Sequence, residues 1–337
     1  MGTLIRSAAF VSLLIAVSAN AQIAPRRHAI GWPFPLPSCA PGIVTYASEI
    51  DDFALAGPDI YFADSADVIW RVPKVGGASP VRLVRAPGIV LWMKAEDSRL
   101  YFAAVSGELT ADIYSMPIGG DSFVTVASGL LTPVAFRTDS QFIYALSIGT
   151  PSGEDFLSDG SVKRVAKTSG TVQTLVSGLS FPLDLVVRGN SIYYGETGIA
   201  AGNTSAGLRR IAADGSGAPV KLFDSGPIIS IAVDDTNAYF VVAKLGIGLV
   251  DIDRMPLSGG AVTPMVTDLD FADGLTIQRG NLYYVAEINE SPSIDAISLA
   301  GGAPRTVKAV ETWESRLEFD ECLVYYATDA RIERAAP

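Results

Sequence analysis

Three aspartates are the residues of this sequence best suited to metal chemistry. Asp52, Asp184 and Asp273 each stand near the start of a predicted inner strand, and Asp51 precedes the first of them. Ca²⁺ prefers oxygen ligands, so converging inner strands would let these carboxylates share one calcium ion and support a calcium-dependent hydrolase or lactonase. Segment 268–274 weakly resembles a calcium-binding loop, but it lacks the full spacing and the terminal Glu.

A second interpretation of the same carboxylates is structural. Lys94, Arg137 and Arg316 lie in or beside the predicted inner strands and could pair with them. Charged side chains that leave solvent need such partners, whereas solvated turn carboxylates contribute little. The sequence leaves both interpretations open.

We identify no set of residues in the sequence that could perform other enzyme chemistry. The single histidine, His28, lies in a proline-rich segment, so no Ser-His-Asp or Cys-His arrangement has a base. No His and Cys cluster suits zinc, and no glycine-rich loop opens a helix to hold phosphate. We therefore expect a non-enzymatic binding or interaction scaffold, with the calcium-dependent hydrolase or lactonase as the alternative.

A repeat of roughly 40–50 residues organises the chain. Each copy has short runs of β-branched and aromatic residues, broken by Gly or Pro, and periods of this length are typical of four-stranded propeller blades. A tyrosine that begins a β-rich doublet marks each of seven copies, at Tyr61-Phe62, Tyr101-Phe102, Tyr144-Ala145, Tyr193-Tyr194, Tyr239-Phe240, Tyr283-Tyr284 and Tyr325-Tyr326. The pattern predicts an all-β protein, a β-propeller of seven four-stranded blades.

The two ends of the repeat predict how the ring closes. The seventh copy stops at Pro337, where the turn to its fourth strand should begin. Residues 42–47 directly precede the first copy and align with the other fourth strands, so we expect the N-terminal strand to complete the last blade. Cys39 and Cys322 would then lie on one face, where a disulfide can form in an oxidising compartment; the alternative is two unpaired thiols.

The chain divides into three segments. Residues 1–21 read as a signal peptide, with Arg6 before an apolar core and small residues at the cleavage point. Residues 22–41 form a proline-rich arm, and residues 42–337 form one propeller domain. We expect an exported monomer in the periplasm or outside the cell, with no membrane span. The chain has 25 basic and 36 acidic residues, so we do not expect nucleic acid as a partner.

Two long connections indicate where a ligand could bind. Residues 149–160 and 197–207 belong to adjacent copies and leave the same face of the predicted ring. They predict a binding rim for a protein, glycan or small-molecule ligand, although surface loops also lengthen without function. The predicted rim residues are Glu154, Asp155, Asp159, Glu196 and Asn203.

Arginine recurs on the third strand of the repeat, at Arg71, Arg164, Arg210, Arg254 and Arg334. One copy per blade favours a structural role, with the stems lying over blade edges and the guanidinium groups solvated or paired.

The first copy, DIYFADSADVIWRVPKVGG at residues 59–77, resembles the YWTD-type and TolB-like propeller repeats of exported and cell-surface proteins. It is most similar to exported bacterial repeat proteins without an assigned function. The resemblance implies a propeller and an export route, and it transfers no catalytic residue. Because many such proteins have six blades, six is the alternative to seven.

Overall fold

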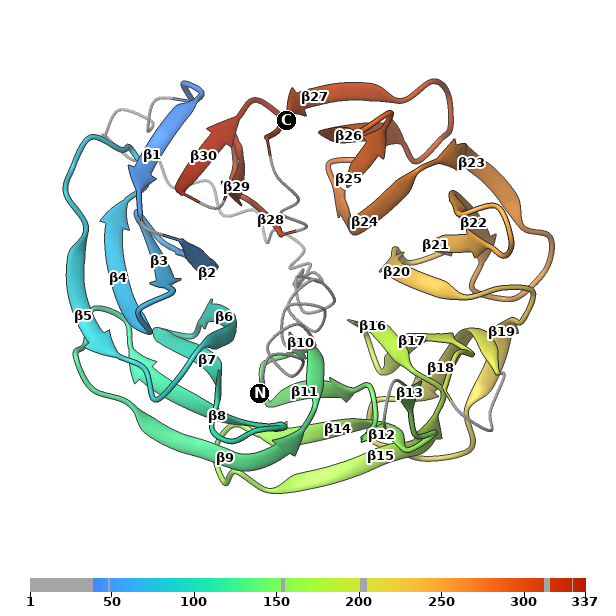
Figure 1. The fold of residues 1–337 in the computed structure, drawn as a ribbon, viewed down its shortest axis with the longest axis horizontal. Coiled ribbons are helices and arrows are strands. Elements are labelled where there is room, and N and C mark those ends of the chain that lie inside the picture. The colour runs from blue at the N-terminus through green and yellow to red at the C-terminus, as the bar shows by residue number, and fades with distance from the viewer. Residues whose placement is uncertain (1–38, 48, 153–154, 201–204, 312–315, 329) are drawn as a thin grey trace.

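Seven four-stranded antiparallel sheets form the blades of a ring (Figure 1). The computed structural model of the 337-residue chain describes residues 39–47, 49–152, 155–200, 205–311, 316–328 and 330–337. The predicted seven-bladed propeller is confirmed, and the six-bladed alternative is wrong. The predicted signal peptide, His28 and most of the proline-rich arm lie outside the described residues.

We letter the strands of each blade a to d, from the channel outward. Blades 1 to 3 consist of β2 (Ile50–Ala56), β3 (Asp59–Asp64), β4 (Val68–Pro73) and β5 (Val81–Arg85); β6 (Val90–Glu96), β7 (Arg99–Val105), β8 (Thr110–Pro117) and β9 (Val124–Leu131); and β10 (Pro133–Thr138), β11 (Phe142–Ser147), β14 (Gly160–Ala166) and β15 (Val172–Leu179). A two-stranded ribbon, β12 (Pro151–Ser152) and β13 (Asp155–Phe156), lies in the b–c connection of blade 3.

The remaining four blades follow the same order. They consist of β16 (Pro182–Arg188), β17 (Ser191–Thr197), β18 (Ala206–Ala212) and β19 (Val220–Phe223); β20 (Ile228–Val233), β21 (Asn237–Lys244), β22 (Leu249–Pro256) and β23 (Thr263–Leu269); β24 (Phe271–Gln278), β25 (Asn281–Ile288), β26 (Ser291–Ser298) and β27 (Arg305–Ala309); and β28 (Leu317–Phe319), β29 (Val324–Thr328), β30 (Arg331–Ala335) and β1 (Gly42–Tyr46).

The core lies between the blades because strand b alternates its side chains between two neighbours. In blade 5, Tyr239 packs with residues of blade 6, including Tyr284, whereas the next residue, Phe240, packs against Tyr193 of blade 4. These side chains are all almost fully buried, and each contributes on the order of 2 kcal/mol when it leaves water. No blade can bury both of its faces alone, so the aromatic doublets make each blade depend on the next.

An aspartate five residues before the tyrosine fixes the a–b turn in three blades. Its carboxylate accepts bonds from turn amides and from the tyrosine hydroxyl, so the buried hydroxyl keeps a partner. The hydroxyl-to-carboxylate distances are 2.7 Å for Tyr144 and Asp139, 2.8 Å for Tyr239 and Asp234, and 2.8 Å for Tyr325 and Asp320.

Three strand c arginines join their blade to the c–d turn of the following blade. Arg164 donates to the carbonyl oxygen of Ala213 at 2.9 Å, and Arg254 donates to that of Leu299 at 2.9 Å. Arg334 in the last blade donates to the carbonyl oxygens of blade 1 at Lys74, 2.6 Å, and Val75, 3.0 Å. The structural role predicted for this column is confirmed for these three arginines, which we call the arginine clasps.

The ring closes as the sequence predicted. Strand β1 pairs antiparallel with β30, from Gly42 opposite Arg334 to Tyr46 opposite Arg331. The N-terminal strand therefore completes the blade that the C-terminal strands begin, and the ring has no open sheet at its closure.

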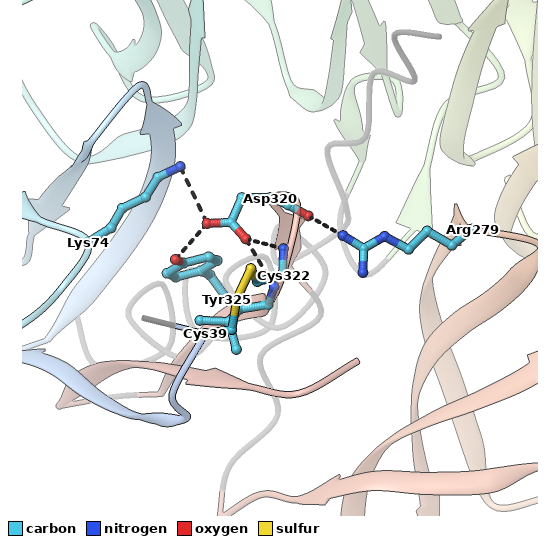
Figure 2. Close-up of a disulfide and its surroundings, with 7 residues drawn as sticks. Cys39, Lys74, Arg279, Asp320, Cys322 and Tyr325 are labelled. Atoms are coloured by element: carbon cyan, nitrogen blue, oxygen red, sulfur yellow. Dashed lines mark hydrogen bonds and ion pairs between the residues drawn. A yellow bond between two sulfur atoms is a disulfide. The ribbon is translucent and has the colours of Figure 1, made fainter. Parts of the chain in front are cut away.

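A disulfide joins the two chain ends beside this closure. Cys39 bonds to Cys322 with a Cα–Cα distance of 5.4 Å, which confirms the predicted pair (Figure 2). Asp320 in the same turn contacts Lys74 of blade 1 through an ion pair of 3.8 Å, and its carbonyl accepts a bond from Arg279 of blade 6 at 3.2 Å. The disulfide turn therefore connects three consecutive blades.

Removing an arginine clasp is expected to weaken the ring. Arg254→Met keeps most of the apolar stem but leaves the Leu299 carbonyl without its donor, so the free energy of unfolding should fall by about 1–3 kcal/mol. Chemical denaturation of the variant measures this loss, with the exposed Arg82→Met as matched control. Equal midpoints for the two variants would contradict the clasp.

Removing the disulfide is expected to cost more, because it closes a loop of 283 residues in sequence separation. The paired substitution Cys39→Ser and Cys322→Ser should lower the free energy of unfolding by about 3–5 kcal/mol. Reduction of the wild-type protein should give the same decrease. A double variant that unfolds at the wild-type denaturant concentration would show that the bond does not stabilise the closure.

Candidate functional site

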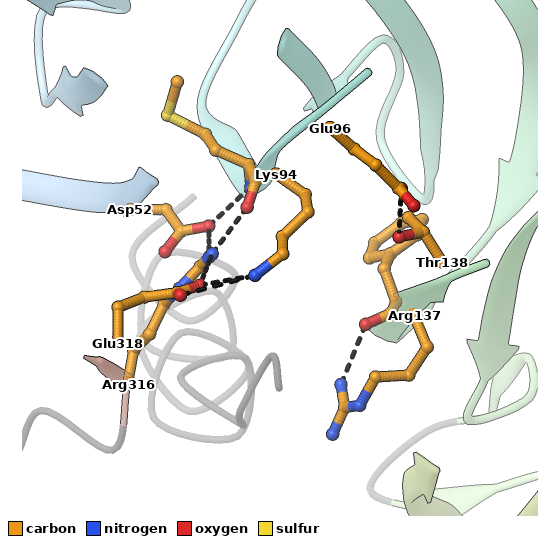
Figure 3. A network of polar contacts seen from close by, with 9 residues as sticks. Asp52, Lys94, Glu96, Arg137, Thr138, Arg316 and Glu318 are labelled. Carbon is orange, nitrogen blue, oxygen red and sulfur yellow. Dashed lines mark hydrogen bonds and ion pairs between the residues drawn. The ribbon is translucent and has the colours of Figure 1, made fainter. Parts of the chain in front are cut away.

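The predicted channel aspartates lie in a belt of charged side chains on the innermost strands. In one network Arg316 donates to Asp52 and, at 3.1 Å, to Glu318, while Lys94 pairs with Glu318 at 3.0 Å (Figure 3). The amide of Met93 also donates to Asp52 at 2.6 Å. These contacts join the inner strands of blades 1 and 2 to blade 7.

A second network joins blades 3, 4 and 5. Arg137 on β10 pairs with Asp184 on β16 at 2.7 Å, and the amide of Ile231 on β20 donates to the other oxygen of Asp184 at 2.8 Å. Asp273 on β24 accepts the amide of Gly274 at 2.6 Å. Arg137 and Asp184 are both almost fully buried, so their charges depend on each other and on the backbone.

Burial and pairing separate the proton affinities of these carboxyls. Burial raises the pKa of Asp273 from 3.8 to about 7, and it raises that of Asp52 to about 6 although Arg316 opposes the shift. Burial acts in the same direction on Glu318, but Lys94 and Arg316 hold its pKa below the ordinary value.

The structural interpretation accounts for two of the three candidate calcium ligands, because Asp52 and Asp184 pair with Arg316 and Arg137. Within the residues that the structure describes, no three His, Cys, Asp or Glu side chains form a group that could hold a metal ion. Binding of calcium by Asp52, Asp184 and Asp273 stays a prediction.

The predicted rim residues are not equivalent. Glu154 and Asn203 lie outside the described residues, and of Asp155 only the backbone, in β13, is described. Asp159 accepts bonds from the amide and hydroxyl of Thr150, both at 2.7 Å, and so closes its own loop. Glu196 is buried, where it accepts the amide of Ser180 at 2.9 Å. Their role in a binding rim stays a prediction.

Exposed aliphatic side chains distinguish the face that carries these loops. We call this side of the ring, with its b–c and d–a connections, the loop face. Leu245 and Ile247 in the b–c turn of blade 5 are 79% and 63% exposed. Blades 2 to 6 each place at least one such side chain at a b–c connection, and the d–a connection before blade 2 adds another: Leu109, Leu157, Ile199, Leu245, Ile247, Ile288 and Ile89.

The charges exposed around these aliphatic side chains are mainly acidic. Bases at this end of the blades are paired: Arg85 pairs with Asp67 at 3.3 Å, and Lys244 pairs with Asp251 and Asp268. Exposed acidic residues at the loop end of the blades are Glu49, Glu108, Asp159, Asp268, Asp270, Glu290 and Glu311. The loop face is therefore apolar at its turns and negatively charged between them.

Sequence reasoning missed the aliphatic side chains because it searched the loops for polar residues. The signal was present in Leu245-Gly-Ile247-Gly, where two large apolar residues occupy a tight turn that normally carries polar ones.

Comparison with known proteins shows the fold alone. No protein-family model and no curated protein matches the sequence. Similar solved structures include the WD40 β-propeller domain of Doa1, at 11% identity over 89% of this chain and 95% of that chain, with a TM-score of 0.62. An oligogalacturonate lyase in complex with manganese has 10% identity over 83% of this chain and 86% of that chain, also with a TM-score of 0.62.

A TolB structure from Agrobacterium tumefaciens also matches, at 14% identity over 65% of this chain and 82% of that chain. Its TM-score of 0.47 is too low to support an argument. The chain is thus a seven-bladed β-propeller whose structural neighbours include both a lyase and a WD40 domain. No helix among the described residues is long and apolar enough to cross a membrane.

The buried carboxyl of Asp273 predicts a pH-dependent stability. Because folding raises its pKa from 3.8 to about 7, the native state favours the protonated form, and this stabilisation is lost as the pH rises from about 4 to 7. Asp273→Asn removes the charge, so its stability relative to the wild type should rise between pH 4 and pH 8, by up to ~4 kcal/mol. Denaturation at both pH values measures the change.

The exposed Asp121→Asn serves as the matched control for the loss of one carboxylate. A difference between Asp273→Asn and wild type that is the same at pH 4 and pH 8 would contradict the burial of an ionisable Asp273.

Proposed function

We propose that this protein is an exported β-propeller that binds a partner protein on its loop face and catalyses no reaction. The observation that carries the proposal is the exposed aliphatic side chain that each of five successive blades places at a b–c connection. Single exposed aliphatic residues are ordinary on protein surfaces. Their gathering on one face of a ring supports an interaction surface.

The charge of the loop face supports a particular class of partner. Its exposed acids outnumber its bases, and Lys244 and Arg85 are already paired with acids of the same face. Complementary charge steers association and disfavours like-charged partners. The partner is therefore a protein segment that presents basic and aliphatic side chains together.

Export to the periplasm or the extracellular space fits two features of the chain. The Cys39–Cys322 disulfide is the type of bond that persists in oxidising compartments. The apolar segment that begins the sequence has the order of charges and small residues typical of a signal peptide. Both support a protein that meets its partner outside the cytoplasm.

The alternative function is a calcium-dependent hydrolase or lactonase that uses Asp52, Asp184 and Asp273. Two of these carboxylates are already engaged by arginines, and no contact among the described residues favours this alternative over the scaffold. Metal-dependent hydrolysis of a lactone or ester panel by the purified protein would establish it in place of the scaffold.

The loop-face proposal predicts a selective loss of binding. The probe is a synthetic amphipathic peptide of Lys and Leu, compared with an otherwise identical peptide of Glu and Leu. Calorimetry should detect binding of the Lys peptide alone, and the affinity should fall with added salt. Leu245→Ser combined with Ile247→Ser should weaken binding at least tenfold, about 1.4 kcal/mol, because it removes apolar contact area.

The matched control is Val75→Ser combined with Ile118→Ser, which removes two exposed aliphatic side chains from c–d turns on the opposite face. The control should bind like the wild type. Equal affinity for the wild type and the loop-face variant would overturn the proposal. Loop-face substitutions that convert a dimer to a monomer in sedimentation would instead identify a second copy of this chain as the partner.

A further inference from the structure

A groove of about 370 Å³ opens between blades 2 and 3, away from the loop face. Tyr101, Ser115 and Thr125 of blade 2 line one side, and residues 167–170 in the c–d turn of blade 3 line the other. Arg99 lies at the start of β7, where it also lines the groove. The volume falls within the range of small-molecule sites, roughly 300–1,000 Å³.

The groove occurs where the repeat departs from its own pattern. In blades 3, 5 and 7 the strand c residue opposite the tyrosine of the repeat is an arginine clasp, as Arg164 is opposite Tyr144. In blade 2 the residue opposite Tyr101 is Ser115. A hydroxymethyl side chain thus stands where blades 1, 3, 4, 5 and 7 place a long guanidinium side chain, and blade 6 has Ala296 there. In blade 2 the space that the longer side chain would fill is open.

The c–d turn of blade 3 nevertheless approaches blade 2 closely. A Cβ on Gly170 would lie 2.0 Å from the carbonyl oxygen of Val126, and the φ of Gly170 is +69°. Only glycine fits this contact without a shift of the backbone. The turn therefore bounds the groove in a fixed position although no arginine clasp reaches it.

The groove presents an arginine without an acidic partner. Arg99 donates through Nε to the hydroxyl of Ser115, and among the described residues no carboxylate lies within ion-pair distance of its guanidinium group. Lys167 differs, because it pairs with Glu96 at 2.6 Å and lies 4.9 Å from the centre of the Tyr101 ring. A guanidinium group that is not neutralised fits a carboxylate or phosphate in a two-pronged bond.

Hydroxyl groups and an aromatic ring surround this arginine. The groove is lined by the hydroxyls of Ser115, Thr125, Ser140, Thr168 and Ser169 and by the ring of Tyr101. Hydroxyl groups act as donors and acceptors at once, which suits a ligand rich in hydroxyls. We propose that the groove binds a small sugar that carries one acidic group, with the oxyanion on Arg99 and the sugar hydroxyls on the serine and threonine side chains.

The test introduces into blade 2 the arginine that it lacks at position 115. Ser115→Arg should place a clasp across the groove and fill it, and Arg99→Met should remove the charge with little loss of volume. Calorimetry of the full chain with D-glucuronate, D-glucose 6-phosphate, D-glucose and inorganic phosphate separates the ligand's features. At least one sugar acid should bind the wild-type protein, and each variant should weaken that binding tenfold or more.

Ser115→Arg should also leave the thermal midpoint at or above the wild-type value, because a clasp donates to the neighbouring turn. If this variant fails to fold, Arg99→Met alone decides, with circular dichroism confirming its native strands. Carboxylate and phosphate as sources of the oxyanion are distinguished by which of the two sugar acids binds more tightly.

Three results would overturn the proposal. If neither sugar acid binds at millimolar concentration, the groove is not a binding site for this class of ligand. Equal binding of D-glucose shows that Arg99 does not select an acid, and equal binding of inorganic phosphate shows that the hydroxyl groups do not select a sugar. The double variant Leu245→Ser with Ile247→Ser should bind the sugar acid as the wild type does. The test of the groove therefore does not depend on whether the loop face binds a partner protein.

Discussion

The contact between one blade and the next is the interaction on which this structure depends. Each four-stranded sheet buries large aromatic side chains on both faces, as Tyr239 and Phe240 do in blade 5, and neither face is stable in water alone. The blades must therefore form a complete ring. Pairing of β1 with β30 completes it, and the Cys39–Cys322 bond holds the two chain ends at that point.

Polar groups reinforce these contacts at two levels. At the centre, Asp52, Asp184 and Glu318 pair with bases from other blades. Burial raises the pKa of Asp52, whereas Lys94 and Arg316 hold that of Glu318 below its ordinary value. Further out, the arginine clasps bond to carbonyl oxygens of the following blade, as Arg254 does. These residues are explained by the repeat, so the features that remain for function are those that depart from it: the aliphatic turns of the loop face and the serine at position 115.

Much of the architecture could be predicted because repetition makes weak local signals add. The tyrosine doublets predicted seven blades, and the strand missing after Pro337 predicted the closure by residues 42–47. The pairing of Cys39 with Cys322 followed from the same register. The sites were harder to predict because they depend on exposure and on neighbours distant in sequence. The exposure of Leu245 depends on its place in the b–c turn of blade 5, and the groove beside Ser115 needs the opposing turn at Gly170 to exist.

We propose that the channel carboxylates maintain the ring while a partner binds on the loop face. Hydrogen exchange of the intact protein, with and without the Lys and Leu peptide, tests it most directly. The account predicts slower exchange in the turns at residues 244–249 and 288–291, with no change in the channel strands β16 and β24. Protection confined to β16 and β24, around Asp184 and Asp273, would contradict it.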